Sequence, residues 1–461
     1  MKACLNFDCT SFDCTYHLNM LKSALRQITQ YEQTQIPTFE AAQAYYNVGK
    51  LEECEQVVLE LHKNDMVTKA VKRLQQKIDI QKLQISEGKY DFKSMVEEAK
   101  ENFVVKCQNY VNPNIEIREA GNKRFGYFAK SKIEIGTKLM VEKAFLIADF
   151  HQMFKQLQVK VELKDLQLSQ YLTLKGGDNS LSFDNMNLKL SRNGCKAFPK
   201  LEEEFKKDSQ KHQVLVLSSC TLNHSCLPNA FWYFIGDVQF IIAQREINEN
   251  EQIFLSYVDS LVPCELQPSA IRSLFGFECE CQMCQTMTMQ DRVQISKLKQ
   301  ALENKVNATK SEVTKNDIES VKEICARVEK VFEDSQARRS DLSHYYTELS
   351  YVMHKTGEFQ TTRGAIDVGI KALECFGIDG AQARIGKLVM IPDKQHFMNY
   401  QVLGNTMNIL SFCFLTRNQP KNSEIELWLK FLEQVFTNVT GGCTDEIKQY
   451  LKQRLEDCGV K

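Results

Sequence analysis

The chain has 461 residues, of which 43% are hydrophobic and 25% are charged, a globular composition too long for one small core. Its 58 basic and 59 acidic residues give a formal net charge of -1, which excludes a bulk attraction to nucleic acid or to a membrane surface. Seventeen cysteines are spread along the chain, and no apolar run approaches the roughly 18 residues of a membrane helix. These features predict a soluble protein with reduced thiols, in the cytoplasm, the nucleus or both.

Residues 1–110 are predicted to be helical. Apolar residues recur at three- and four-residue spacing, as at Cys54, Val57, Val58 and Leu61, which is typical of an amphipathic helix. The small residues, aromatic rings and glycine of residues 41–53 resemble a tetratricopeptide repeat. A plain helical layer packed on the next domain explains the same pattern, and both interpretations stay open.

Short β-type runs punctuated by glycine begin near residue 111 and continue to residue 260, which predicts a compact β-rich domain. Residues 138–141, 230–235, 238–243 and 252–257 are among its expected strands. The charged, helix-like stretch at about 150–215 is interpreted as an insertion into this domain. Residues 291–461 return to a helical pattern with repeat-like texture, so the fold class is predicted to be α+β.

Four segments of the β-rich domain carry side chains suited to chemistry, and they follow one another in a fixed order. They are Lys123-Arg124-Phe125-Gly126, Asn223-His224-Ser225-Cys226-Leu227-Pro228-Asn229, Ser256-Tyr257-Val258-Asp259 and Cys279-Glu280-Cys281-Gln282-Met283-Cys284.

Together these segments resemble the SET domain of protein-lysine methyltransferases, in the branch that contains the SET-and-MYND proteins and the proteins that join tetratricopeptide repeats to SET. The resemblance covers residues 113–285. The MYND finger of the named branch is missing, because Cys195 is the only cysteine between residues 130 and 215.

The resemblance implies transfer of a methyl group from S-adenosylmethionine to lysine side chains of histones or other proteins. It makes Tyr257 the catalytic tyrosine and puts Phe275 in the lysine channel, where relatives often have a second tyrosine. Because Phe275 lacks that hydroxyl, we hypothesise that the channel permits di- or trimethylation. The cofactor residues that the resemblance implies are Lys123, Arg124, Phe125, Gly126, Asn223, His224, Tyr257 and Phe277, with Asn193 as a weaker candidate.

Three cysteines at 279, 281 and 284 offer three thiolates, and a closed structural zinc site needs a fourth ligand. The resemblance supplies Cys226 as that ligand and makes residues 261–290 a zinc-binding segment after the SET domain, which occupies 111–260. A disulfide is the competing interpretation. Near the N-terminus, Cys4, Cys9, Cys14 and His17 have zinc-ligand chemistry but not a common finger spacing, so buried or loose thiols are the preferred interpretation and a second zinc site is the alternative.

One departure from the family bears on activity. Relatives usually have Gly-Arg-Gly or Gly-Asn-Gly where this chain has Arg124-Phe125-Gly126. A catalytically inactive SET scaffold that binds proteins is therefore the alternative function. A nucleic-acid-binding or metal-sensing protein is a third interpretation, but the chain has no basic excess. The expected partners are a protein substrate and proteins bound by the helical repeats, without direct nucleic acid or membrane contact.

Overall fold

The computed structural model divides the chain into two compact units. The first comprises Met1–Asn112, Leu139–Thr221 and Tyr233–Phe240, and the second comprises Pro113–Lys138, Leu222–Trp232 and Ile241–Lys461. The structure describes residues 14–47, 50–102, 105–121, 125–148, 157, 171, 174, 195–196, 213–258, 262–308, 313–335, 338–356, 359–391, 398–415 and 422–440.

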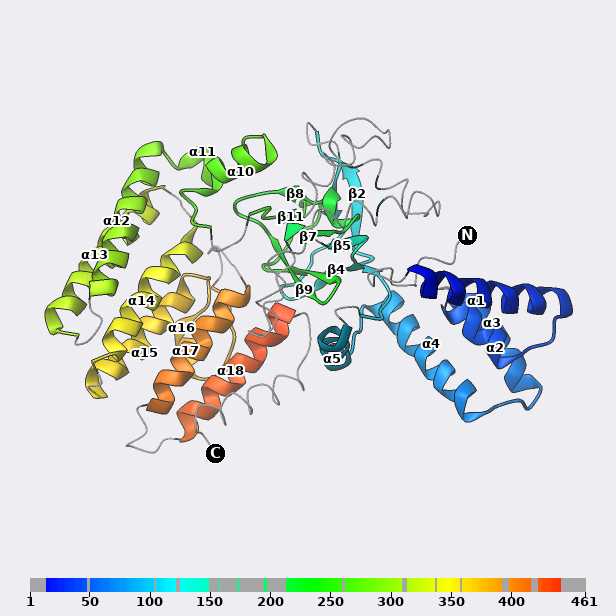
Figure 1. The fold of residues 1–461 in the computed structure, drawn as a ribbon. Helices are drawn as coiled ribbons and strands as arrows, with labels where there is room; N and C mark the ends of the chain where they lie inside the picture. The colour runs from blue at the N-terminus through cyan, green and yellow to red at the C-terminus, as the bar shows by residue number, and fades with distance from the viewer. Residues whose placement is uncertain are drawn as a thin grey trace. The chain divides into compact units, whose positions relative to one another are not determined.

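The N-terminal part of the first unit is helical (Figure 1). Its helices are α1 (Cys14–Thr34), α2 (Phe39–Asn47), α3 (Leu51–Lys63), α4 (Lys69–Glu87) and α5 (Phe92–Asn102). The apolar positions of α2, α3 and α4 pack with α1 as one core, made by Ala24, Ile28, Ala41, Ala42, Ala44, Tyr45, Cys54, Val57, Val58, Leu61, Val71, Leu74 and Ile78. The helical spacing read from the sequence therefore marks the faces that are buried.

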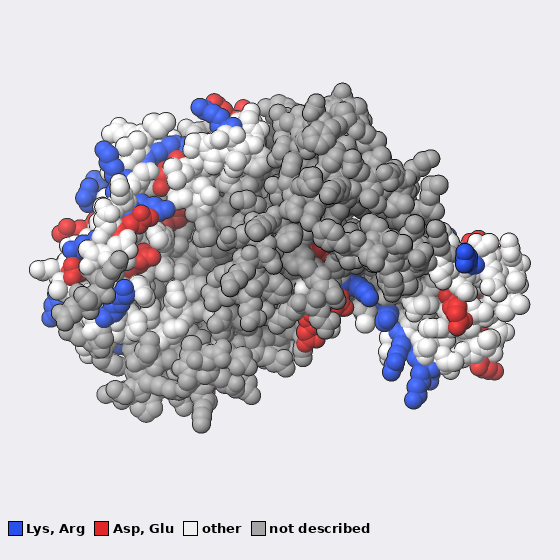
Figure 2. Space-filling model, in the orientation of Figure 1, with Lys and Arg blue, Asp and Glu red and all other residues white. Residues whose placement is uncertain are grey.

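Local interactions determine where α4 begins and where it ends. The hydroxyl of Thr68 accepts a hydrogen bond from the Val71 N–H at 3.3 Å, which satisfies one of the open donors of the first turn. Gly88 ends the helix with a φ of 61°, and a Cβ there would lie 2.8 Å from the Tyr110 ring. Only glycine meets both demands without strain. Lys and Arg side chains gather along α4 (Figure 2).

The β-rich part contains short strands. They are β1 (Tyr110–Val111), β2 (Ile115–Glu119), β3 (Phe125–Ala129), β4 (Lys138–Lys143), β5 (Leu146–Ala148), β6 (Cys195–Lys196), β7 (Gln213–Leu215), β8 (Asn223–His224), β9 (Ala230–Ile235), β10 (Val238–Ala243) and β11 (Phe254–Leu255).

Among the described residues these strands form four small sheets. The largest has the order β1-β4-β10-β9, and a second has the order β5-β7-β6. β2 pairs antiparallel with β3, whereas β8 and β11 form a parallel pair. The expected helical insertion at about 150–215 falls mostly outside the described residues, but Cys195–Lys196 within it pairs with β7.

Helices follow in the second unit, up to Thr440. They are α10 (Gln267–Phe275), α11 (Gln282–Thr286), α12 (Met289–Ala308), α13 (Lys315–Ser335), α14 (Leu342–His354), α15 (Phe359–Glu374), α16 (Gly380–Arg384), α17 (Tyr400–Leu415) and α18 (Asn422–Thr440). Their apolar core includes Phe332, Phe376 and Trp428, and it extends to Cys226 and Met283. Helices together with small sheets confirm the predicted α+β class.

The helices of the described residues were also compared with the length and hydropathy of membrane spans. None of them combines the length and the apolar character that a crossing would require.

Candidate active site

The parallel pairing of β8 with β11 builds the centre of the site. Asn223 lies opposite Phe254 and His224 lies opposite Leu255. The Ser225 N–H continues the ladder by donating to the Leu255 carbonyl at 3.0 Å. Two segments distant in sequence, 223–226 and 254–257, are thereby held side by side within the second unit.

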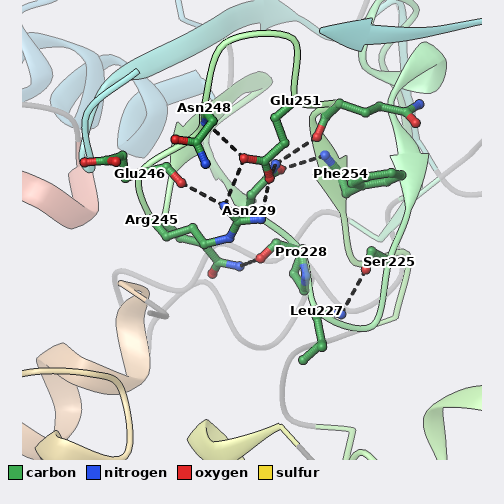
Figure 3. A network of polar contacts seen from close by, with 11 residues as sticks. Ser225, Leu227, Pro228, Asn229, Arg245, Glu246, Asn248, Glu251 and Phe254 are labelled. Atoms are coloured by element: carbon green, nitrogen blue, oxygen red, sulfur yellow. Dashed lines mark hydrogen bonds and ion pairs between the residues drawn. The ribbon is translucent and has the colours of Figure 1, made fainter. Parts of the chain in front are cut away.

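A buried asparagine fastens these segments to each other (Figure 3). Asn229 is fully buried, and its Nδ2 donates to Glu251 Oε1 at 2.9 Å and to the Gln252 carbonyl at 2.8 Å. Its Oδ1 accepts the Phe254 N–H at 2.8 Å. Because one side chain satisfies three polar groups, it fixes the approach to β11.

Glu251 is the charged member of this network. Burial alone would raise its pKa, but the hydrogen bond and charge of Arg245 outweigh burial and hold the pKa below the ordinary value. Arg245 Nη2 contacts Glu251 Oε1, and the Asn248 N–H donates to Glu251 Oε2 at 3.0 Å. The ionised carboxylate therefore ties the turn at residues 245–251 together (Figure 3).

Gly126 makes the closest backbone approach in the site. A Cβ at this position would lie 2.1 Å from Gln252 Nε2 and 2.9 Å from Asn223 Nδ2. Asn223 Nδ2 donates to the Phe125 carbonyl at 2.9 Å, while Gln252 Nε2 is buried without a hydrogen-bond partner. A buried N–H donor without a partner reduces the stability of the fold unless a ligand accepts its hydrogen bond. The first segment's other predicted residues, Lys123 and Arg124, lie outside the described residues, as does Asn193.

Aromatic rings gather around Tyr257. Its ring centroid lies 5.2 Å from that of Phe275 and 6.3 Å from that of Phe277. The Tyr257 hydroxyl donates to the Leu222 carbonyl at 2.7 Å, so its oxygen keeps lone pairs that can accept a hydrogen bond. The Phe277 ring is 37% exposed and offers a face for stacking.

His224 lies between the aromatic group and the cysteines. Its Nδ1 accepts the Tyr257 N–H at 3.1 Å, and its Nε2 lies 3.3 Å from Cys226 Sγ. Both ring nitrogens therefore have partners within the protein, whereas the resemblance implied a contact to the cofactor.

The structure brings Cys226, Cys279, Cys281 and Cys284 together. Their sulfur atoms all lie within 4.8 Å of one another, and those of Cys226 and Cys284 are 3.5 Å apart. Four thiolates around a tetrahedral zinc ion, at Zn–S distances of about 2.3 Å, would be about 3.8 Å apart. The cluster is compatible with zinc, and none of the four is oxidised to a disulfide.

Crowding of the four sulfur atoms separates their acidities. Hydrogen bonding from Cys226 lowers the pKa of Cys279 well below its usual range and the pKa of Cys281 to about 6. Hydrogen bonding to Cys279 and its neighbours raises the pKa of Cys226 far above its usual range. Four thiolates cannot accumulate here without a compensating cation.

The structure also contains a second group of potential metal ligands, which the sequence did not predict. Cys264, Glu265 and Asp341 lie within the same 4.8 Å limit. Arg338 is buried against Asp341 at 2.6 Å, and the Cys264 N–H also donates to that carboxylate. The guanidinium of Arg338 therefore already balances the negative charge of this group. Of the four N-terminal residues considered as zinc ligands, Cys4 and Cys9 lie outside the described residues, as do the side chains of Cys14 and His17.

One comparison with known proteins matches a stretch of the chain that includes the β-rich part and the helices α4 and α5 before it. Residues 53–258 match the family model described as SET domain. Human N-lysine methyltransferase SMYD2 is 31% identical over 116 residues, which are 25% of this chain and 26% of that protein. SET domain and MYND-type zinc finger protein 6 of Schizosaccharomyces pombe is 35% identical over 66 residues, 14% of each chain.

A solved structure was also found, the Neurospora SET domain protein DIM-5, a histone lysine methyltransferase. It is 13% identical, with a TM-score of 0.19, over 32% of this chain and 52% of that chain. The chain spans about a quarter of the length of the SMYD2 proteins that it matches. Together with the motifs at 223–229, 256–259 and 279–284, the family match shows that the chain carries a SET domain related to those of the SET-and-MYND proteins.

Proposed function

We propose that the protein transfers methyl groups from S-adenosylmethionine to lysine side chains of proteins. One observation carries the proposal: Tyr257 has its hydroxyl fixed on the Leu222 carbonyl and its ring beside Phe275 and Phe277. This arrangement lies within a SET domain, and relatives of that domain carry the name N-lysine methyltransferase.

The residues around Gly126 fit a methyl donor with polar and aromatic parts. We assign the buried, unpartnered Gln252 Nε2 and the Asn223 amide to its polar end, and the exposed face of Phe277 to its adenine ring. When bound, S-adenosylmethionine supplies an electrophilic methyl group on a cationic sulfur. The protein then needs to supply position rather than a nucleophile.

The lysine side chain has to lose a proton before it can attack. Its ordinary pKa is about 10.4, and an apolar, partly dehydrated channel favours the neutral amine. Phe275 and Tyr257 provide aromatic walls that also accommodate a methylated ammonium product. The Tyr257 oxygen orients the amine by accepting a hydrogen bond from it.

We assign zinc to Cys226, Cys279, Cys281 and Cys284 as a structural ion. All four ligand positions are then protein thiolates, so the ion has no open position for substrate. It ties α11 and the segment before it to the β8 region, since Cys284 lies in α11 and Cys226 follows β8. Because this ligand set needs reduced thiols, we propose a reducing compartment, the cytoplasm or the nucleus.

The substrate proposed here is a lysine of a histone or another protein, with the helical regions available for further protein contacts. The alternative function, an inactive SET scaffold, is favoured by the Arg124-Phe125 departure. Phe125 weakens that alternative, because its side chain is 53% exposed while its carbonyl receives the Asn223 amide. A bulky residue at this position leaves the backbone contact intact.

The proposal is tested by transfer of label from methyl-labelled S-adenosylmethionine to a protein lysate or peptide array. We expect Tyr257→Phe to lower transfer to lysine about 100-fold or more, a loss typical of removing one positioned hydroxyl. Tyr351→Phe, at an exposed tyrosine of α14, is the matched control and should transfer like the wild type. Absence of transfer together with absence of cofactor binding in calorimetry would contradict the proposal and favour the inactive scaffold.

A further inference from the structure

We propose that His224 is a positioning residue that couples the four-cysteine metal site to the backbone of Tyr257. The proposal rests on the proposed function, and it adds a role for this imidazole other than contact with the methyl donor. It starts from the two contacts of the ring, 3.1 Å from Nδ1 to the Tyr257 nitrogen and 3.3 Å from Nε2 to Cys226 Sγ.

The first contact determines where the ring proton sits. A backbone N–H can only donate, so Nδ1 has to accept, and the proton of the neutral ring is on Nε2. Nε2–H therefore points at Cys226, whose sulfur would accept it as a thiolate when a metal ion is bound. Such a bond to a ligand atom orients the ligand and adjusts how strongly it holds the metal.

Packing prevents the ring from adopting another orientation. His224 is 4% exposed, and its centroid lies 5.3 Å from that of Tyr257 and 6.0 Å from that of Phe277. A flipped ring would put carbon atoms where both contacts are made. The orientation that serves Cys226 is thus the one that serves Tyr257.

Tyr257 is consequently held at both ends by one short segment. Its hydroxyl donates to Leu222 and its N–H donates to His224, while Cys226 follows two residues later. A displacement of Cys226 is transmitted through a single rigid ring to the start of the Tyr257 side chain. This geometry lets the metal site determine how well the phenol is positioned.

Two substitutions separate the two contacts in the full-length, zinc-loaded protein. His224→Asn puts an amide oxygen near the Nδ1 position and retains an acceptor for Tyr257, but it does not reach Cys226. His224→Gln puts an amide N–H near the Nε2 position and retains the donor to Cys226, but not the acceptor. His62→Gln, at an exposed histidine of α3, is the control for the substitution itself.

Three readouts follow each variant: zinc affinity by competition with a chelator, hydrogen exchange of the Tyr257 amide, and kcat against KM for a lysine substrate. We expect His224→Asn to lose about 10-fold to 100-fold in zinc affinity, with slow Tyr257 exchange that no longer depends on whether zinc is bound. We expect His224→Gln to retain zinc affinity, with faster Tyr257 exchange and a kcat reduced about tenfold at unchanged KM.

Equal losses of zinc affinity and amide protection in both variants would indicate a merely structural ring and overturn the coupling. Unchanged zinc affinity and exchange in both would overturn it as well. The zinc and exchange readouts do not need turnover. If the wild type transfers no methyl group, the proposed function fails while these two readouts still decide the role of His224.

Discussion

Glu142 is a carboxyl group whose surroundings favour its neutral form. It lies on β4, almost fully buried, and both of its oxygens are 3.1 Å from the Ser218 nitrogen. Burial raises its pKa from 4.5 to about 7, although the hydrogen bonds from Ser218 act in the opposite direction. The carboxyl group therefore titrates near neutral pH in the folded protein.

The sign of the resulting pH dependence follows from linkage. An acid whose folded pKa is raised stabilises the fold fully below its unfolded pKa and loses that contribution as pH rises through the folded pKa. Between pH 4.5 and about 7, Glu142 should thus reduce the free energy of unfolding by about 3 kcal/mol. Urea unfolding across this window should show a flatter profile for Glu142→Gln. Parallel profiles of variant and wild type would contradict the assignment.

Phe275 is the residue at which we expect the degree of methylation to be set. Its ring lies 5.2 Å from that of Tyr257 and lacks the hydroxyl that could bind the amine or a water molecule beside it. Phe275→Tyr should shift products from di- and trimethyl-lysine toward monomethyl-lysine, measured by mass spectrometry of the modified peptide. Only monomethyl-lysine in the wild type, unchanged in the variant, would contradict the hypothesis.

At the scale of single elements, β11 depends on a side chain more than on its short ladder. Asn229→Ala removes the acceptor of the Phe254 N–H and two further hydrogen bonds. Leaving buried groups unpaired should lower the free energy of unfolding by about 3 kcal/mol. Denaturant unfolding measures this loss directly.

Asn248→Ala provides the comparison within the same turn. Asn248 contributes its backbone N–H to Glu251, and alanine keeps that group, so we expect a change within about 0.5 kcal/mol. An equal effect of the two substitutions would mean that the buried amide of Asn229 is not what holds β11.

The elements differ in how far the sequence predicts them. The β-type runs at 230–235 and 238–243 coincide with β9 and β10, because aromatic and β-branched side chains there meet a local hairpin partner. The run expected at 252–257 is a strand only at Phe254–Leu255. Its other contacts go to Asn229 and to the Tyr127 carbonyl, and tertiary contacts of this kind leave no periodic pattern.

The same distinction applies to the site. The motifs at 223–229, 257 and 279–284 were predicted from a resemblance, and the structure brings Cys226 to the other three cysteines. The roles of Gln252 and Asn229 were not predicted, although both lie in segments singled out from the sequence. Their roles depend on the parallel pairing of β8 with β11, which spacing alone cannot reveal.

At the scale of the whole molecule, the cysteine cluster is continuous with a much larger core. Cys226 and Met283 belong to the same buried cluster as Phe332, Phe376 and Trp428 of the C-terminal helices. A metal ion at the cluster would therefore stabilise the second unit broadly, because its binding energy contributes to folding. The core of α2, α3 and α4 is a separate buried cluster.

Zinc removal should distinguish the two cores. After chelation we expect faster hydrogen exchange in the second unit, at 254–257 and in α11 and α12, and unchanged exchange in α3. Hydrogen-exchange mass spectrometry with and without chelator measures both in one experiment. Equal deprotection of α3 and α12, or protection retained in both, would contradict a metal site that supports only the second unit.

The parallel pairing of β8 with β11 also limits how early the β-rich domain can fold during protein synthesis. Residues 223–226 are translated before Leu255 and before the cysteines of 279–284. For that interval Cys226 is a thiol without its three companions, and Asn223 and His224 have no strand beside them. The β-rich domain thus cannot complete its folding until these later residues have been added. A ribosome stalled before residue 279 would carry a nascent domain without its metal site.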